Sequence, residues 1–302
     1  MSAQSETVRR LTVVDIAKLH ADRVRIPTIT AYDYPTAQLV DEAEIPLILV
    51  GDSLGQVMLG YDTTVRVSMD EMLHHAKAVV RGSQRALVVA DMPFLSYATV
   101  DDALENAGRF LRDAGVQAVK VEGGVRSART IEALVRAGIP VMGHIGLTPQ
   151  AINTLGRVRV QGKSREQARA LLADALAVQE AGAFSIVLEL LPGQLAQAVT
   201  ERLHIPTIGI GSGAGCSGQI QVVTDLLGLG TWTPRHARKY ADLHGVILEA
   251  LRGYRADTEA GTFPGSAETV LMDAAVLDEV LGRGEQDRAD VPATGIPLDR
   301  DL

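Results

Sequence analysis

Eight short apolar runs, separated by helical stretches, constrain the fold of this chain more than any other feature of its sequence. Most of the runs are continuously apolar, which is typical of parallel strands that are buried on both faces. They span residues 25–33, 45–52, 86–93, 117–123, 139–146, 184–190, 205–212 and 219–225.

The stretches between most of these runs have apolar residues spaced near 3.6, as amphipathic helices do. Several end at Gly or Ala-Gly, a helix C-terminal signal, and the next run begins within a few residues. They span residues 35–43, 68–82, 100–115, 127–138, 164–182 and 192–203. Eight strands with crossover helices in about 250 residues predict a single (β/α)8 TIM barrel, and an open doubly wound sheet is the alternative.

The two ends of the chain extend this α/β pattern. Residues 10–22 predict a helix that precedes the barrel, and residues 234–254 predict its last helix. We therefore expect a catalytic barrel domain over residues 8–265 and an acidic C-terminal extension over 266–302. Within the extension, residues 266–282 predict one acidic amphipathic helix, and residues 284–302 read as disordered.

Charge and composition exclude several classes of function. The net charge is −8, and the segment from residue 266 onward holds nine acids and three bases, so most of the excess lies there. The rest of the chain is nearly neutral and has no basic cluster, so we expect no nucleic-acid partner. The polar start MSAQSETVRR lacks a secretory signal, and the apolar runs are too short to cross a membrane. With Cys216 as the one cysteine, no disulfide forms within the chain, and we expect a cytoplasmic protein without a membrane partner.

The segment IGIGSGAGCSGQ contains the pattern G-x-G-x-x-G at Gly213, Gly215 and Gly218. A dinucleotide-binding fingerprint follows the first strand of its unit, with an acid about 20 residues further on. Here the glycines follow the seventh run, and the residue at that distance is Arg238. The pattern therefore predicts a tight loop at the mouth of the barrel, where the backbone turns sharply or a ligand approaches it.

Ionisable residues occur at the carboxyl ends of five successive runs, the second to the sixth. In a (β/α)8 barrel these ends meet on one face, where the chemistry takes place, so we expect the residues to form one site. They are Asp52 with Ser53, Asp91, Lys120 with Glu122, His144 and Glu189.

The residue types favour proton abstraction beside a metal-bound carbonyl. Asp52, Asp91 and Glu122 are hard oxygen ligands, and Mg²⁺ takes one or two carboxylates while water and substrate oxygens fill its other positions. The chain has no histidine or cysteine pairs at zinc-site spacing. Glu189 is the candidate general base that removes a proton from a 2-oxo acid, and Lys120 neutralises the developing charge.

Each residue also has a structural interpretation. Asp52 and Ser53 fit a turn or a helix N-cap, and His144 fits a satisfied core histidine. Lys120 and Glu122 lie two apart on one strand face and fit a structural ion pair. Their common place at one end of the barrel favours the catalytic interpretation.

Eight strings resemble the ketopantoate hydroxymethyltransferase (3-methyl-2-oxobutanoate hydroxymethyltransferase) family in its order and spacing over about residues 8–265. They are TAYDYPTA, LVGDSLG, GYDTT, VVADMPF, AVKVEGG, IPVMGHIGLTPQ, VQGK and IPTIGIGSG. The resemblance implies a barrel of the phosphoenolpyruvate mutase and isocitrate lyase superfamily. It implies transfer of a one-carbon unit from 5,10-methylenetetrahydrofolate, the co-substrate, to 3-methyl-2-oxobutanoate, which gives 2-dehydropantoate in pantothenate biosynthesis.

The resemblance also implies roles for the strand-end residues, with small molecules as the substrates, Mg²⁺ as the metal and a homodecamer as the assembly. Glu189 matches the family's proton acceptor. The metal residues implied are Asp52, Asp91 and Glu122, and the substrate-binding residues implied are Asp52, Ser53, Asp91, Lys120 and His144.

The chain departs from the family pattern at three places, which limits what can be inferred from the resemblance. Ser217 stands where the family commonly has aspartate, Arg157 stands where it commonly has glycine, and the chain after Pro264 differs from the family's common ending. We expect the first two to affect the folate side of the reaction. The alternatives are another Mg²⁺-enolate lyase of the superfamily, for which Cys216 is the one candidate loop cysteine, and a barrel that has lost catalysis.

Overall fold

Eight parallel strands close into a barrel in the computed structural model, which describes residues 9–282. Each strand pairs with the next in chain order, and β1 also pairs with β8, so the sheet has no open edge. This confirms the (β/α)8 barrel and excludes the doubly wound sheet. The strands are β1 Ile26–Thr30, β2 Leu47–Val50, β3 Leu87–Asp91, β4 Ala118–Glu122, β5 Val141–Gly146, β6 Ser185–Glu189, β7 Thr207–Ile210 and β8 Gly218–Gln221.

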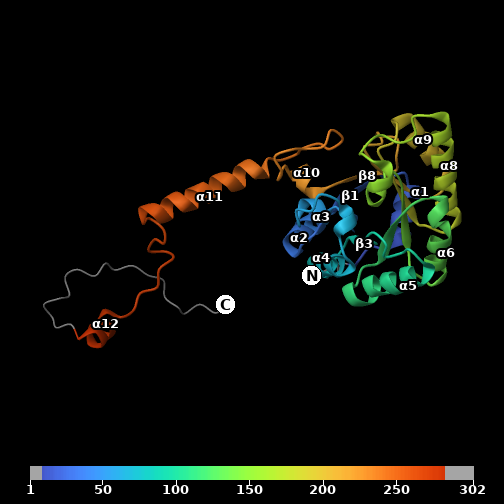
Figure 1. The fold of residues 1–302 in the computed structure, drawn as a ribbon. Coiled ribbons are helices and arrows are strands. Elements are labelled where there is room, and N and C mark those ends of the chain that lie inside the picture. Colours follow the sequence, from blue (N-terminus) through green and yellow to red (C-terminus); the bar gives the residue numbers. More distant parts are fainter. Residues whose placement is uncertain (1–8, 283–302) are drawn as a thin grey trace, which may run out of the picture. The chain divides into compact units, whose positions relative to one another are not determined.

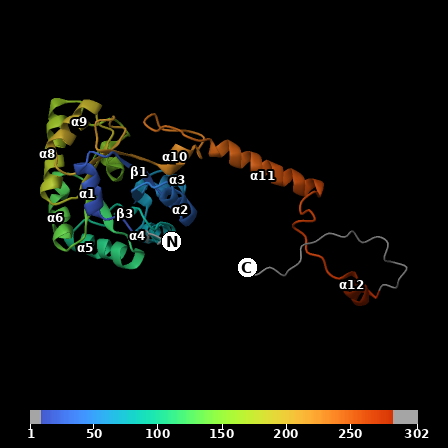
Figure 2. The same cartoon turned by 180° about the vertical axis from the view of Figure 1, so that it is seen from behind.

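Helices follow most of the strands and cover the outside of the barrel, with α5, α6, α8 and α9 in succession along one side (Figures 1 and 2). Capping boxes at Ser68–Glu71 and Ser164–Gln167 begin the two longest of these helices, α4 and α8, because side chains there satisfy otherwise unpaired amides. The bounds are α1 Val13–Ala21, α2 Tyr34–Glu42, α3 Leu54–Val57, α4 Met69–Gly82, α5 Val100–Arg109 with the π-turn Phe110–Ala114, α6 Ala128–Arg136, α7 Ile152–Leu155, α8 Arg165–Glu180, α9 Gly193–Arg202 and α10 Val223–Leu227. Short 3₁₀ turns span Thr64–Arg66, Val125–Ser127 and Pro149–Ala151.

The interior of the barrel is apolar at one end and polar at the other. Successive side chains of a strand point to opposite faces, so residues two apart stack along the barrel axis. In β3, Leu87 and Val89 belong to the apolar interior cluster, and Asp91 continues their row at the carboxyl end. This alternation places the strand-end charges together on one face.

Helix α1 contributes to the apolar end of the barrel interior. Ile16 of α1 is fully buried in the same cluster as Ile26 and Leu47, which lie at the amino ends of β1 and β2. The polar groups are therefore at the end opposite α1, where the strands finish.

The glycine-rich segment connects β7 to β8 without a helix and returns from the carboxyl end of β7 to the amino end of β8. A Cβ on Gly215 would lie 2.7 Å from Cβ of Gln197 in α9, and one on Gly218 would collide with the carbonyl oxygen of Ile26. Close packing of the backbone therefore explains Gly215 and Gly218. The predicted position at the mouth of the barrel is wrong for Gly218, which begins β8 at the opposite end.

The chain divides into two compact units, one that ends at Tyr240 and one that begins at Ala241. The second unit contains α11, Leu243–Ala260, and α12, Ala274–Leu281. The helix predicted over 234–254 thus begins and ends later in the sequence, as α11. It belongs to the same compact unit as the residues that follow it. The barrel boundary at residue 265 stays a prediction.

The acidic helix predicted over 266–282 forms only in its second half. The side chain of Asp273 accepts a hydrogen bond from the amide of Ala275 and caps α12, so the helix begins there. The tail predicted to be disordered lies outside the described residues. Within residues 9–282, no helix combines the length and the apolar content that crossing a bilayer requires.

Candidate active site

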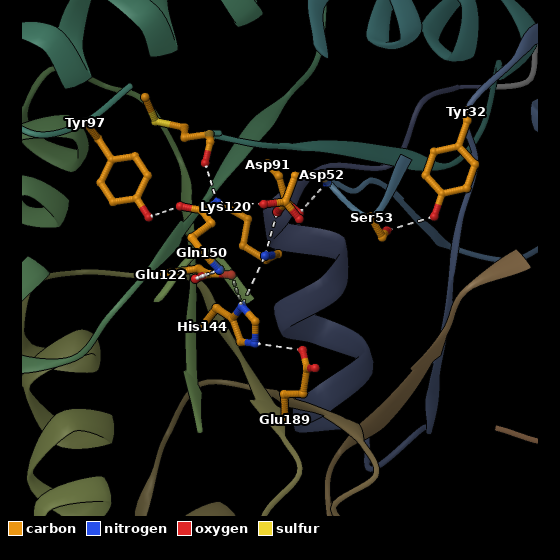
Figure 3. Close-up of polar contacts among 11 residues, drawn as sticks. Tyr32, Asp52, Ser53, Asp91, Tyr97, Lys120, Glu122, His144, Gln150 and Glu189 are labelled. Carbon is orange, nitrogen blue, oxygen red and sulfur yellow. Dashed lines mark hydrogen bonds and ion pairs between the residues drawn. The ribbon is translucent and has the colours of Figure 1, made fainter. Parts of the chain in front are cut away.

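All seven strand-end residues line one cavity of about 570 Å³ at the carboxyl end of the barrel (Figure 3). Asp52 and Ser53 directly follow β2, whereas the others belong to the strands themselves. The shared lining consists of Asp52, Ser53, Asp91, Lys120, Glu122, His144 and Glu189. The structure therefore brings together every residue that strand-end position singles out.

Lys120 is a buried cation that pairs with the neighbouring strand. Its Nζ lies 2.6 Å from Asp91 Oδ1 and 3.2 Å from His144 Nδ1. Burial lowers the pKa of Lys120, but Asp91, Glu122 and Asp52 act in the opposite direction and leave the pKa above its ordinary value. The structural alternative, a Lys120–Glu122 ion pair along one strand, is wrong, because Glu122 instead faces His144.

His144 lies between two carboxylates. Its Nδ1 is 3.3 Å from Glu122 Oε1, and its Nε2 is 3.1 Å from Glu189 Oε2. Burial and the Lys120 cation lower the pKa of His144, but the contacts with Glu122 and Glu189 outweigh them and raise it to about 9. At neutral pH the imidazolium form is favoured, so Glu189 has a cationic neighbour that orients its carboxyl group.

Asp52 is a carboxylate in negative surroundings. Burial, followed by the charges of Asp91 and Glu122, raises its pKa well above the usual range. Its Oδ2 accepts a hydrogen bond of 2.8 Å from Gln150 Nε2, and its Oδ1 accepts none within residues 9–282. One oxygen of Asp52 is thus available to a cation or a ligand in the cavity, which would offset the cost of burying the charge.

A metal at this site would have few protein ligands. Among the described residues, no group of three or more His, Cys, Asp or Glu side chains is arranged to hold a metal ion. Mg²⁺ takes only one or two carboxylates, and Asp52 and Asp91 lie side by side, with the Asp52 amide 2.9 Å from Asp91 Oδ2. The donor set therefore fits Mg²⁺ and does not fit a closed zinc site.

Ser53 precedes α3, but its side chain does not cap that helix. Its Oγ instead lies 2.8 Å from the hydroxyl of the buried Tyr32. The interpretation of Ser53 as a side-chain helix cap is therefore wrong. Its hydroxyl instead contacts Tyr32 at the wall of the cavity.

Gln150, which strand-end reasoning missed, links three parts of the site. Its Nε2 donates to Asp52 and to the carbonyl of Met92, its Oε1 accepts from Tyr97 at 2.5 Å, and its amide donates to Glu122 Oε2 at 3.2 Å. Gln150 is buried in the loop after β5, within the family-like string HIGLTPQ. The sequence signal for Gln150 was its position after a strand end. Strand-end reasoning considered ionisable side chains, so it did not single out a neutral glutamine.

The departures from the family pattern lie outside this cavity. Neither Arg157 nor Ser217 belongs to its lining, and Ser217 exchanges hydrogen bonds with Thr207 at the amino end of β7. Cys216 is fully buried beside it, and burial raises the pKa of its thiol. A buried thiol of this kind is a poor nucleophile, which removes the support that Cys216 gave to a lyase.

Solved structures with a similar fold include a lyase and a hydrolase. A 2,3-dimethylmalate lyase, a PEP mutase/isocitrate lyase superfamily member, matches with a TM-score of 0.54 at 16% identity, over 92% of this chain and 96% of that one. A phosphonopyruvate hydrolase in complex with oxalate and Mg²⁺ matches with a TM-score of 0.56 at 13% identity, over 92% and 98% of the two chains. At these identities the matches bear on the fold alone, and they agree with the (β/α)8 barrel.

Proteins related in sequence are more similar to this chain than these solved structures are. A Chloroflexus aurantiacus protein named 3-methyl-2-oxobutanoate hydroxymethyltransferase is 60% identical over 278 residues, which cover 92% of this chain and 99% of that protein. The family model described as ketopantoate hydroxymethyltransferase matches residues 10–266. The chain therefore belongs to the ketopantoate hydroxymethyltransferase family of enzymes.

Proposed function

We propose that the protein transfers a hydroxymethyl group from 5,10-methylenetetrahydrofolate to 3-methyl-2-oxobutanoate in a Mg²⁺-dependent reaction of pantothenate biosynthesis. With water as the source of the hydroxyl oxygen, the products are 2-dehydropantoate and tetrahydrofolate. The observation that carries the proposal is the convergence of a carboxylate pair, a buried lysine and a cavity-facing glutamate in one cavity of a family member.

Asp52 and Asp91 would hold the Mg²⁺ ion, with Glu122 associated with it through water. When bound, the ion supplies Lewis-acid polarisation of the carbonyl of the oxo acid. The oxygen of Asp52 without a hydrogen bond and the raised Asp52 pKa support a cation at this position. The solved phosphonopyruvate hydrolase with oxalate and Mg²⁺ is a precedent for this fold with an oxo-acid-like ligand.

The chain's own groups then carry the proton and stabilise the charge. Glu189 accepts the C3 proton of the oxo acid, and the nearby His144 holds the Glu189 carboxyl in place. Lys120, fixed by Asp91, lies in the same cavity and stabilises negative charge that develops on the oxo acid. Ser53, which lines the same cavity after β2, would contact the substrate there.

Turnover of the purified full chain tests this proposal. Mixed with Mg²⁺, 3-methyl-2-oxobutanoate and 5,10-methylenetetrahydrofolate, the protein should form 2-dehydropantoate, which mass spectrometry detects, and EDTA should abolish the product. Deuterium uptake at C3 without product would mean that enolate formation is correct and the one-carbon donor is wrong. Neither product nor deuterium uptake would contradict the proposal as a whole.

Gln150 should act as a positioning residue for Asp52. The substitution Gln150→Glu keeps the size of the side chain but replaces the donor to Asp52 with a second carboxylate. Because such supporting contacts are worth about 10- to 100-fold in metal affinity or activity, we expect kcat to fall and the Mg²⁺ requirement to rise by that order. Initial rates over a Mg²⁺ titration measure both.

Gln194→Glu on the exposed surface of α9 is the matched control for Gln150→Glu and should leave both parameters unchanged. Removing only the Tyr97 hydroxyl, in Tyr97→Phe, deletes one hydrogen bond to Gln150 and should have a smaller effect. A Gln150→Glu protein with wild-type Mg²⁺ dependence would show that Gln150 does not position Asp52.

The cellular context and the assembly stay predictions. Family membership favours small-molecule substrates, a cytoplasmic enzyme and a homodecamer. Sedimentation of the full chain would measure the assembly directly.

A further inference from the structure

The side chains proposed for catalysis come from β2 to β6, five of the eight strands around the cavity. A second wall comes from β8 and the segment that follows it, within the first compact unit. A cavity of about 570 Å³ lies in the usual range for ligands much larger than a short oxo acid. This second wall consists of Ile220, Val222, Thr224, Asp225, Leu229, Gly230, Trp232, Pro234 and His236.

Asp225 is the carboxylate of this wall. It lies half-buried on α10, and its side chain makes no hydrogen bond or ion pair to any residue in the described range 9–282. Burial raises the pKa of Asp225, and the one opposing influence is the charge of His236. A carboxylate in this position lacks the donors that partly buried carboxylates normally have, so a ligand with N–H groups would be favoured beside it.

Trp232 gives the same wall a large aromatic surface. Its side chain lines the cavity and is 74% exposed, although an indole of this size is normally packed away from water. Pro234 adds a second flat apolar surface to the lining. An exposed indole and an unpaired carboxylate that line the same cavity suit a planar ligand with N–H donors along one edge.

We infer that Asp225 and Trp232 bind the pterin end of the reduced folate co-substrate, an assignment that rests on the proposed function. The 2-amino-4-oxopyrimidine ring of a tetrahydropterin presents two adjacent N–H donors, from N3 and the 2-amino group. A carboxylate accepts both in a bidentate contact, and the indole stacks on the adjoining ring. The one-carbon unit bridges N5 of the pterin and N10, so a pterin held at this wall brings it into the cavity that Glu189 also lines.

This assignment places the folate side of the reaction on the segment 220–236. It differs from the expectation from the sequence that Arg157 and Ser217 affect the folate side, and neither of them lines the cavity. A phosphate-bearing or purely anionic ligand is disfavoured at the same wall, because Asp225 would repel it.

Binding of tetrahydrofolate to the full chain tests the inference without turnover. Trp232 is the one tryptophan in the sequence, so quenching of intrinsic fluorescence reports directly on this wall, and calorimetry gives an independent Kd. We expect Asp225→Asn to weaken tetrahydrofolate about 10- to 100-fold, because one acceptor becomes a donor that faces the 2-amino group. p-Aminobenzoylglutamate, which lacks the pterin, should bind equally to both proteins.

Asp70→Asn, on the exposed surface of α4, is the matched control and should bind tetrahydrofolate like the wild type. Circular dichroism shows whether Asp225→Asn is folded. A second measurement needs no variant: on the wild type, a tetrahydrofolate analogue without the 2-amino group should lose affinity by a similar factor.

Equal affinity of Asp225→Asn and wild type for tetrahydrofolate would overturn the inference. So would an equal loss of p-aminobenzoylglutamate binding, because the substitution would then have disturbed the wall instead of the pterin contact. If the wild type exchanges the C3 proton of the oxo acid but does not bind tetrahydrofolate, the proposed donor is itself wrong, and the inference falls with it.

Discussion

Replacing Glu189 by glutamine should abolish exchange of the C3 proton of 3-methyl-2-oxobutanoate. Glu189 is the last residue of β6, its side chain is 16% exposed, and it lines the cavity beside His144. An amide keeps the shape of the carboxyl group but cannot accept a proton. General bases contribute about 10²- to 10⁴-fold, so we expect the exchange rate to fall about 10³-fold, or about 4 kcal/mol in the barrier.

The measurement is deuterium uptake at C3 with Mg²⁺ and the oxo acid alone, followed by NMR or mass spectrometry. The absence of folate isolates proton abstraction from the one-carbon transfer. Glu201→Gln, on the exposed surface of α9, makes the same chemical change away from the cavity and should exchange at the wild-type rate. If Glu189→Gln exchanges as fast as this control, another group is the base.

The fold could be predicted from the sequence because its pattern is local. Continuous apolar runs of strand length, most of them followed by an amphipathic helix, leave few arrangements other than a closed parallel barrel. The same reasoning found the site, because alternation along a strand puts Asp91 in the row of Leu87 and Val89, at the end where ligands bind.

The contacts that depend on neighbouring strands could not be predicted from the sequence. Lys120 and Glu122 share a strand face, yet Lys120 pairs with Asp91 across the β3–β4 register, while Glu122 lies opposite His144 across β4–β5. Gln150 carries no charge, so its role depends on bonds that only the folded loop reveals. The helix predicted over 266–282 failed in its first half because periodicity does not locate the Asp273 cap.

Replacing Lys120 by methionine should both destabilise the fold and abolish turnover. Lys120 is 4% exposed and pairs with Asp91 at 2.6 Å in a cavity that four further carboxylates line. Removing one partner of a buried ion pair leaves an uncompensated charge, which costs about 3 to 5 kcal/mol. Asp91 can take up a proton in the variant, so we expect a loss near 3 kcal/mol in the free energy of unfolding.

The double substitution Lys120→Met with Asp91→Asn separates stability from catalysis. Removing both charges of the pair should restore a large part of the lost unfolding free energy, because the two single effects share one interaction and are not additive. It should not restore turnover, because neither the cation nor the carboxylate needed at the oxo acid is present. Lys77→Met, on the exposed surface of α4, is the matched control and should change stability by less than about 0.5 kcal/mol.

Urea unfolding and the turnover assay are both applied to the wild type, the two single variants and the double variant. They give one double-mutant cycle for stability and one for activity. Additive losses of stability would mean that the Lys120–Asp91 contact is not a coupled pair. A stable Lys120→Met protein with wild-type turnover would assign Lys120 no role in the reaction. Recovery of stability without recovery of turnover would show that the buried pair stabilises the barrel and that its charges are also required by the chemistry.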